Sequence, residues 1–308
     1  MSWKPIVVGV DGSPESAWAA AVGADMAKAA GTSCHLVHAT RDVAAALALA
    51  ESPERAEQWN ASLIAQVRER AQHGLWGVVP TELVESVALR DGRASVVLKE
   101  VAAELDAGLV VLGGKRHSIF GRWLAGSTGL DVARTTEVPL LVTGGARVPI
   151  RRVLAAADLS GAAQPTIEAA ERYAGLFGAE LRVLSVIEPL PAIPEAPNYD
   201  LTEYYAALED QLKRRVWSLV RSPQVEKVMR YGMPVDTILG EAAAWPADLA
   251  VVGSHGKGWV DRLLIGSVTE RLLNQLPTSL LVVPAFAVAK VEEPALARRS
   301  EQQRPAFA

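Results

Sequence analysis

The sequence predicts an α/β protein made of two tandem, doubly wound domains, each built on a parallel sheet. Short apolar segments alternate along the chain with longer amphipathic segments, a pattern typical of buried strands separated by helices. The same order of segments then occurs a second time, which indicates one unit used twice. Each unit has about 140 residues, a normal size for a domain and too long for a solenoid repeat.

The repeat is clearest around a glycine-bearing loop. Residues 106–127, DAGLVVLGGKRHSIFGRWLAGS, align without gaps on residues 246–267, PADLAVVGSHGKGWVDRLLIGS. The starts of the two copies also correspond, PIVVGVDGSPES in the first and RRVLAAADLSGA in the second. A joint is expected at GGARVP, which holds two glycines and a proline. We therefore predict domains at residues 1–146 and 147–288, followed by a polar tail at 289–308.

The first copy opens with Ile6–Val10, an apolar run typical of a strand buried on both faces. A helix is expected at Ser13–Ala30, because Pro14 stands in its first turn. A longer helical segment at Ala44–His73 is expected to break near Ser52-Pro53. The other strands are predicted at Cys34–Ala39, Thr81–Ala88, Leu109–Leu112 and Leu140–Val142, and the other helices at Ala94–Ala103 and Ser127–Thr135.

The second copy repeats this order of elements. Leu249–Val252 is a short apolar run bounded by glycine, and Pro277 marks the end of the helix beyond its loop. The other strands are predicted at Val153–Ala156, Glu180–Ile187, Val225–Arg230 and Leu280–Val283, and the helices at Thr166–Phe177, Thr202–Val220, Pro234–Ala244 and Ser267–Gln275. Right-handed crossovers between parallel strands then place helices on both faces of each sheet.

Composition excludes several classes of protein. The chain has 308 residues, of which 50% are hydrophobic, yet no apolar run approaches the ~18 residues of a membrane span. The single cysteine, Cys34, excludes an intramolecular disulfide and a cysteine-cluster metal site. The N-terminus enters a strand without a signal-peptide pattern, so a cytoplasmic location is expected. A net charge of −4 without a basic stripe disfavours nucleic acid as a partner.

The loop after Leu249–Val252 combines the features of a phosphate site. It carries Gly253 and Gly256, and Gly266-Ser267 opens the helix that follows. A parallel strand, a glycine-bearing loop and a helix N-terminus leave backbone N–H groups facing one concavity, where the helix dipole adds about half a positive charge. An alternative stays open, because Ser267 and Glu270 also form an S-x-x-E capping box that would satisfy the helix end.

The spacing of these residues resembles a known family. Gly253, Gly256 and Gly266-Ser267 reproduce the G-x2-G-x9-G-[ST] motif of universal stress proteins, and the resemblance covers about residues 4–286. It implies a Rossmann-like sandwich of the adenine-nucleotide α-hydrolase type, with ATP as its ligand. It also implies that the loop wraps the phosphates and ribose, and that an aspartate after the first strand lies beside the adenine and ribose. The implied positions are Asp158, Ile187, Val252, Gly253, Gly256, Gly266, Ser267 and Val268.

Other roles stay open for some of these side chains. Asp158, like Asp11 at the equivalent position of the first copy, is also suited to capping the next helix. Asp158 and Asp261 are the carboxylates considered for Mg²⁺ at the phosphates. His255 stands in the glycine loop, where we expect an exposed side chain, with a contact to phosphate as the alternative.

The first copy differs from the motif at one position. It retains four of the equivalent residues, Asp11, Gly113, Gly126 and Ser127. Arg116, however, replaces the second glycine, where a positive φ would permit close approach of the backbone to phosphate. Arginine is strained at such an angle, so this loop is expected to follow another path. Arg116 either holds phosphate through its charge or marks a degenerate site. We expect the first site to be degenerate or weaker, and the second to bind ATP.

The main functional hypothesis is a nucleotide-responsive regulatory or stress-response module without strong catalysis. No G-x-S-x-G elbow and no H-E-x-x-H spacing occurs, so at most slow ATP hydrolysis is expected. The alternatives are a ligand-free dimerisation scaffold and an adenylating enzyme of the same fold group, although VDGSPES lacks the paired glycines of the S-G-G-x-D-S loop. Members of the resembled family associate through their last strands. Leu140–Val142 and Leu280–Val283 are therefore expected to pair, as an intrachain pseudo-dimer or in a homodimer.

Overall fold

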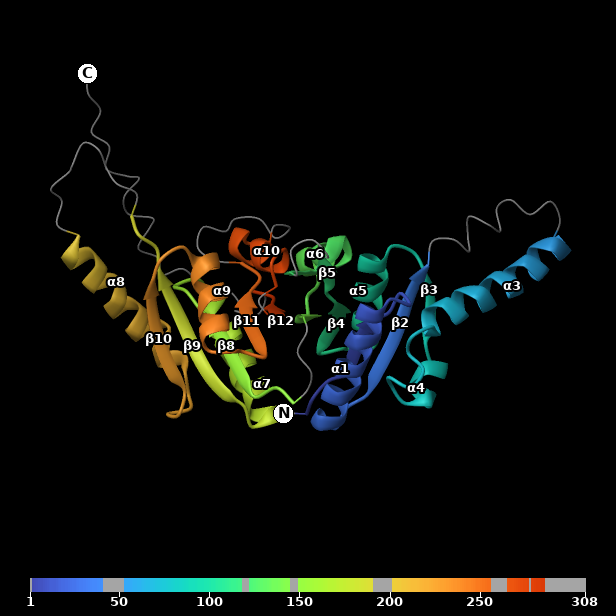
Figure 1. Cartoon of the computed structure of the whole chain (residues 1–308), viewed down its shortest axis with the longest axis horizontal. Helices are drawn as coiled ribbons and strands as arrows, with labels where there is room; N and C mark the ends of the chain where they lie inside the picture. The colour runs from blue at the N-terminus through green and yellow to red at the C-terminus, as the bar shows by residue number, and fades with distance from the viewer. Residues whose placement is uncertain are drawn as a thin grey trace, which may run out of the picture.

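The computed structural model confirms the predicted α/β class (Figure 1). It describes residues 2–40, 53–117, 122–144, 149–190, 201–255, 265–276 and 278–285. The two copies lie side by side and share one elongated body, with their sheets joined at the middle (Figure 1).

The elements of the first copy follow the predicted order. Its sheet strands are β1 (Ile6–Gly9), β2 (Cys34–Thr40), β3 (Ala88–Asp91), β4 (Leu109–Gly113) and β7 (Leu140–Thr143). Its helices are α1 (Pro14–Ala30), α3 (Pro53–Gln72), α4 (Thr81–Glu85), α5 (Ala94–Glu104) and α6 (Gly126–Thr135). Two further short strands, β5 (Lys115–His117) and β6 (Arg122–Leu124), pair with each other in an antiparallel hairpin that the sequence did not predict.

The second copy has the same arrangement. Its strands are β8 (Arg152–Ala156), β9 (Glu180–Ile187), β10 (Glu226–Tyr231), β11 (Leu249–Gly253) and β12 (Ser279–Val283). Its helices are α7 (Ala163–Phe177), α8 (Thr202–Arg215), α9 (Pro234–Ala244) and α10 (Ser267–Leu273), with a 3₁₀ turn, η1 (Trp217–Leu219), after α8. The helix predicted over 202–220 is therefore shorter than expected.

The predicted third strand of the first copy is wrong in its position. Thr81–Glu85 is a short helix, and the strand comes later, at Ala88–Asp91, where it pairs with β2. Pro80 stands at the N-cap with φ −53°, a start that suits a helix. The buried side chains of this segment, Val84 and Val87, are three residues apart, which is a helical and not a strand spacing.

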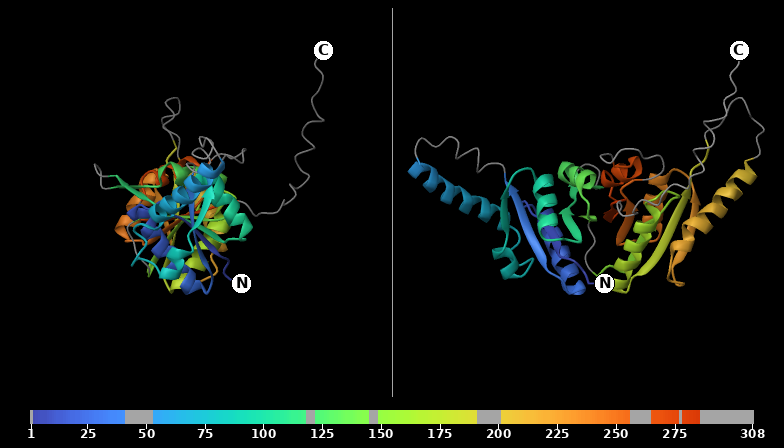
Figure 2. Two further views of the ribbon diagram at one scale, coloured as in Figure 1. Left: turned by 90° about the vertical axis from the view of Figure 1, so that its right-hand side faces the viewer. Right: turned by 180° about the vertical axis from the view of Figure 1, so that it is seen from behind.

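The strands form one ten-stranded sheet in the order β10-β9-β8-β11-β12-β7-β4-β1-β2-β3. Neighbouring strands are parallel except β12 and β7. Two hydrophobic clusters cover its faces. One includes side chains of α1 and α7, and the other includes side chains of α5, α6, α9 and α10, so each half is doubly wound (Figure 2).

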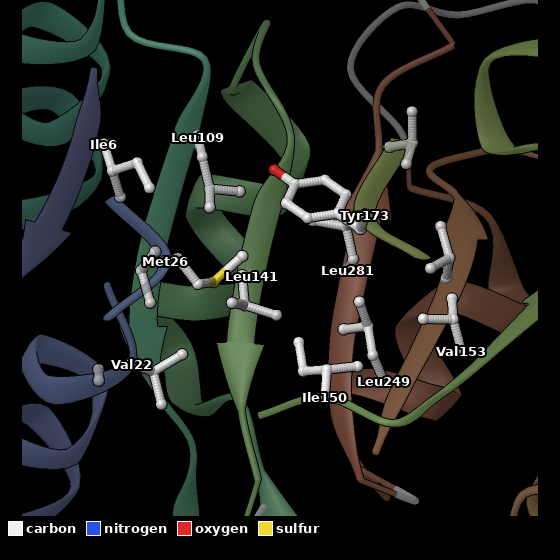
Figure 3. Packing of buried hydrophobic residues seen from close by; sticks show 14 of the residues in the cluster. Ile6, Val22, Met26, Leu109, Leu141, Ile150, Val153, Tyr173, Leu249 and Leu281 are labelled. Carbon is white, nitrogen blue, oxygen red and sulfur yellow. The ribbon is translucent and has the colours of Figure 1, made fainter. Parts of the chain in front are cut away.

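The last strands of the two copies pair within one chain, as one of the two predicted arrangements requires. Leu281 of β12 lies opposite Leu141 of β7, and each is 1% exposed. Figure 3 shows both side chains between buried residues of the first copy, such as Met26, and of the second, such as Val153. Both last strands are interior to the sheet, so β3 and β10 are its edges and a homodimer through the last strands would have no free edge to use.

Candidate functional site

A cleft in the second copy lies where the strand order reverses. β8 and β11 are neighbours, and the helices that follow them, α7 and α10, pack on opposite faces of the sheet. Carboxyl ends of parallel strands open a crevice at such a point. A cavity of about 450 Å³ occupies it. Its walls include all the described residues predicted for this site, namely Asp158, Ile187, Val252, Gly253, Gly266, Ser267 and Val268, while Gly256 and Asp261 lie outside the described residues.

The aspartates after the first strands shape their own loops. The carboxylate of Asp158 accepts a hydrogen bond from the N–H of Ser160 at 3.0 Å, and Oδ1 of Asp11 accepts one from the N–H of Ser13 at 3.0 Å. The N-cap of α7 is Ala162, and the side chain that caps α1 is Ser13. The helix-capping interpretation is therefore wrong for both aspartates, because each lies too far before its helix to reach the first N–H groups.

The ends of the glycine loop are tied together beside the cleft. The N–H of Gly266 donates to the carbonyl of Ser254 at 2.8 Å, and the hydroxyl of Thr269 donates to the carbonyl of Gly253 at 2.7 Å. Gly253 also permits close packing, since a Cβ there would lie 2.6 Å from Cβ of Ala162, the N-cap residue of α7. Packing of α7 on β11 is thus sufficient reason for glycine at 253, whether or not a ligand approaches it.

Ser267 does not form the capping box that its spacing with Glu270 suggests. The N-cap of α10 is Gly266, and no side chain caps this helix end. Ser267 is the first helical residue, which lies too far along for its hydroxyl to reach back to the orphan N–H groups. The carboxylate of Glu270 instead accepts a hydrogen bond from Arg134 at 3.1 Å. The exposed hydroxyl of Ser267 therefore faces the cleft with no hydrogen bond to the described part of the chain.

His255 is a half-buried residue of the cleft wall, so the expected exposed position is wrong. Its Nδ1 lies 2.8 Å from Oγ of Ser254, and that oxygen also accepts a hydrogen bond from the N–H of Ala285 at 3.1 Å. Either group donates in the hydrogen bond between Ser254 and His255, according to which imidazole nitrogen carries the proton. Burial lowers the pKa of His255 below its ordinary value, so the imidazole is neutral at physiological pH.

A buried hydroxyl that the sequence did not single out also lines the cleft. Thr166 is 1% exposed, and its Oγ1 has no hydrogen-bond partner within the described ranges. It lies 3.2 Å from the point where a Cβ on Gly253 would stand. A buried hydroxyl without a partner is unfavourable by about 1–3 kcal/mol, so a polar ligand atom at this point would be stabilised.

The outer wall of the cleft is an apolar stripe on α8 that sequence reasoning missed. Tyr204, Leu208 and Leu212 line the cavity, together with Leu190, which lies three residues beyond the end of β9. Their spacing of four residues on a predicted helix is the signal that identifies one face.

The equivalent cleft of the first copy is much smaller. Its cavity of about 120 Å³ is lined by the predicted residues Asp11, Gly113, Gly126 and Ser127, and by Lys115. Burial by itself would raise the pKa of Asp11, but hydrogen bonds from Ser13 and Ser16 and the charge of Lys115 hold it below its ordinary value. The carboxylate is therefore ionised, and the small volume agrees with the expectation of a weaker site.

The loop of the first copy has its own conformation. Arg116 lies in β5, in extended backbone, and the only non-glycine residue with a positive φ in the described ranges is Asp106. Arg116 thus avoids the strained angle that the motif would impose, while its side chain lies outside the described parts. Gly126 has φ 68°, whereas Gly266 at the equivalent position has φ −62°. The two loops therefore enter their helices differently.

The residue that directly follows each aspartate explains why the cavities of the two copies differ in volume. Gly12 has φ 81°, and a Cβ there would overlap the carbonyl oxygen of Arg70 in α3. α3 can therefore close onto the loop after β1, and the remaining space is divided into the small cavity and a separate pocket of about 370 Å³ beside His38 and Arg70. The second copy has Leu159 at this position, and its side chain forms part of the wall of the larger cavity.

Replacing Gly12 with alanine is expected to destabilise the protein by about 3 kcal/mol or more, because the methyl group meets Arg70 at a backbone angle that already disfavours it. Gly31→Ala is the matched control, since Gly31 also has positive φ, 63°, but nothing lies within 4 Å of its added Cβ. Strain alone is expected to cost the control about 1–2 kcal/mol. Urea unfolding measures both, and equal losses would contradict the closure of α3 on Gly12.

Two kinds of feature are absent from the described ranges. No group of three or more His, Cys, Asp and Glu side chains stands where it could hold a metal ion. No helix among these residues has the length and apolar character needed to cross a membrane.

Comparisons with known proteins identify the family of the chain. The model of the universal stress protein family matches residues 2–144 and again residues 149–284. The universal stress protein Rv2005c of Mycobacterium tuberculosis is 27% identical over 286 residues, which are 90% of this chain and 96% of that protein. A universal stress protein of Thermus aquaticus is 29% identical over 139 residues, which are 43% of this chain and 98% of the relative.

Solved structures share the fold. A universal stress protein from Archaeoglobus fulgidus has a TM-score of 0.61 at 18% identity, covering 91% of this chain and 98% of its own. One from Pseudomonas aeruginosa, titled as putative, has a TM-score of 0.58 at 20% identity, covering 92% of this chain and 93% of its own. At these identities the likeness extends to the fold alone. Because the family model matches both copies, the chain belongs to the universal stress protein family and carries two such units in tandem.

Proposed function

We propose that this protein binds ATP in the cleft of the second copy and acts as a nucleotide-responsive regulatory or stress-response module without efficient catalysis. The observation that carries the proposal is the convergence of Asp158, Gly253 and the unbonded hydroxyl of Ser267 on one cavity of about 450 Å³. These residues come from the ends of β8 and β11 and from the start of α10, so the fold brings distant parts of the motif to one ligand-sized space.

The chemistry of the cleft suits the two ends of a nucleotide. Ser267 and Val268 lie in the first turn of α10, where backbone N–H groups have no partner within the helix and favour a phosphate. Ile187, Pro234 and Ile238 also line the cavity, and their apolar side chains suit the faces of an adenine ring. Asp158 lines the same cavity, and its carboxylate would accept hydrogen bonds from ribose hydroxyl groups.

The residues of the cleft do not favour rapid hydrolysis of ATP. A serine next to a histidine, as in Ser254 and His255, is one requirement of nucleophilic catalysis. Here, however, Ser254 is 4% exposed and its oxygen is engaged by the N–H of Ala285, so it is held as a structural bridge. A regulatory role follows more directly, in which bound ATP changes the surface around the cleft. The small first cleft favours a second, scaffolding role for the first copy.

Removing the hydroxyl of Ser267 is expected to weaken ATP binding by about tenfold to a hundredfold, the effect of losing one hydrogen bond to a charged group. Calorimetric titration of ATP and Mg²⁺ into the wild type and Ser267→Ala measures it. Ser127→Ala, the same change at the equivalent position of the first copy, reports the share of the first cleft and is expected to have little effect.

Three outcomes of this titration count against the proposal. Equal losses in both variants would show that the two clefts bind alike. A loss confined to Ser127→Ala would move the site to the first copy. Absence of ATP binding by the wild type at millimolar nucleotide would leave the scaffold as the better account.

A further inference from the structure

We propose that α10 couples the two clefts, so that a nucleotide in the second cleft changes the ligand-contacting loop of the first. The proposal rests on the proposed binding of ATP in the second cleft and adds a route by which its occupancy is transmitted. The route consists of one short helix with a different cleft at each end.

The two ends of α10 have different neighbours. Gly266, Ser267 and Val268 at its start line the second cleft. At its other end, the carbonyl of Leu273 accepts a hydrogen bond from the N–H of Ala125, at 2.8 Å. Ala125 belongs to the first copy, lines the first cleft and directly precedes Gly126 and Ser127. A helix of seven residues is only about 10 Å long, so the two clefts are joined by a short, stiff element.

The position of Leu273 explains why its carbonyl is available for this hydrogen bond. Leu273 is the last residue of α10, and the last four carbonyls of a helix have no partner within it. Pro277, four residues later, has no N–H that could continue the helix and bind this carbonyl. At the equivalent place of the first copy, α6 continues beyond Ala133 to Thr135.

The connection is consequently one-sided. The counterpart of the Ala125 hydrogen bond would run from the N–H of Ile265 to the carbonyl of Ala133, and no such bond joins these two described residues. The two copies are thus not coupled symmetrically. The helix that begins at the larger cleft supports the loop of the smaller one, and the reverse contact is missing.

A second contact joins α10 to the first copy, through α6. Nη2 of Arg134, in the last turn of α6, donates to Oε1 of Glu270 at 3.1 Å, and the two side chains are 38% and 40% exposed. Glu270 directly follows Thr269, which lines the second cleft. α6 and α10 lie next to each other above the junction of the two sheets (Figure 1). The start of each helix therefore lies close to the end of the other.

A nucleotide that draws the first turn of α10 toward its phosphates must move the whole helix or strain it. A seven-residue helix with intact hydrogen bonds moves as one piece, so the carbonyl of Leu273 shifts with Ser267 and carries the N–H of Ala125 with it. Coupling of this kind is reciprocal, so a ligand in the first cleft would alter affinity at the second by the same factor.

Hydrogen–deuterium exchange of the full chain, with and without ATP and Mg²⁺, tests the coupling. In the wild type, ATP is expected to slow exchange by about fivefold or more both in a peptide covering 265–276 and in one covering 122–130. Two variants interrupt the route. Glu270→Gln removes the charge of the ion pair, and Ala125→Pro removes the N–H at a residue whose φ of −68° suits proline.

In both variants the protection of 265–276 is expected to persist. The protection of 122–130 is expected to fall to the level without nucleotide in Ala125→Pro, and to fall partly in Glu270→Gln, which keeps the hydrogen bond between Ala125 and Leu273. Glu104→Gln, which removes the charge from an exposed ion pair with Arg90 at 2.9 Å, is the control and should keep both responses. If Ala125→Pro does not fold, Glu270→Gln alone decides the question.

Two outcomes overturn the coupling and leave ATP binding intact. Protection of 265–276 without any response at 122–130 in the wild type would show that the helix transmits nothing. Unchanged protection of 122–130 in the variants would show direct binding of ATP to the first cleft. Absence of protection at 265–276 in the wild type is a different result, because it overturns the proposed function together with the coupling that depends on it.

Discussion

Gly256→Arg is expected to weaken ATP binding by at least about a hundredfold, since it would remove close backbone contacts to phosphate equivalent to two hydrogen bonds. Gly256 is the second glycine of the motif and lies outside the described residues, so the expectation rests on the family pattern. Arginine disfavours the positive φ that glycine permits there, and it is the residue that the first copy has at this position. Calorimetric titration with ATP and Mg²⁺ measures the loss.

Arg116→Gly is the reciprocal variant and restores the motif to the first copy. We expect it to add no second equivalent of ATP, because α3 closes on Gly12 and leaves a cavity of about 120 Å³. Recovery of a second equivalent would show that Arg116 alone separates the two clefts. Unchanged binding in Gly256→Arg would contradict the assignment of the phosphates to this loop.

Glu241→Ala is expected to destabilise the protein by about 1.5–3 kcal/mol, because it removes a buried carboxylate that two arginines share, while Arg182 keeps its ion pair with Glu226 at 2.6 Å. The side chain of Glu241 is 6% exposed, and its two oxygens accept hydrogen bonds from Arg182 at 2.6 Å and from Arg230 at 3.0 Å. The guanidinium of Arg182 also lies 4.4 Å from the ring centroid of Trp245. Urea unfolding followed by circular dichroism gives the loss in the free energy of unfolding.

The first copy supplies the control for this measurement. Arg90 is the counterpart of Arg230, but Glu241 is replaced by Val101, and Arg90 instead pairs with Glu104 at 2.9 Å. The two side chains are 51% and 53% exposed, so Glu104→Ala is expected to cost less than about 1 kcal/mol. Similar losses in Glu241→Ala and Glu104→Ala would show that solvent reaches the Glu241 cluster and that burial does not decide its energy.

Much of the fold could be predicted because the chain repeats. The alignment of 106–127 on 246–267 fixed the equivalent elements, and apolar runs buried on both faces are strong signals for parallel strands. The pairing of Leu140–Val142 with Leu280–Val283 was expected from the resemblance and occurs within the chain. The tandem arrangement followed from length and repetition alone.

The errors have local physical causes. Thr81–Ala88 contains apolar residues at a helical spacing after a proline, and a short segment of this kind is easily assigned to a strand. Ser267 and Glu270 match a capping box in sequence, but the helix starts one residue earlier than that motif requires, and Glu270 accepts a hydrogen bond from Arg134 instead. A partner from the other copy is invisible to a local pattern.

The site was predictable in its residues and not in its shape. Gly253 and Ser267 were identified from the spacing of the motif, and Asp158 from its place after the first strand and from the resemblance; all three line one cavity. The alignment of the two copies already shows Gly12 at the position of Leu159. The effect of this difference on the volume of the cavity depends on how closely α3 approaches Gly12, which is a tertiary contact. The buried hydroxyl of Thr166 likewise could not be predicted, because Thr166 belongs to no sequence motif.

A crystal structure of the protein with a slowly hydrolysed ATP analogue and Mg²⁺ would show where the nucleotide binds. We expect one nucleotide per chain in the second cleft, with phosphates beside Gly253 and Ser267, ribose beside Asp158 and adenine beside Ile187. A nucleotide bound only in the cleft of Asp11 and Lys115, or an empty second cleft at saturating nucleotide, would contradict it.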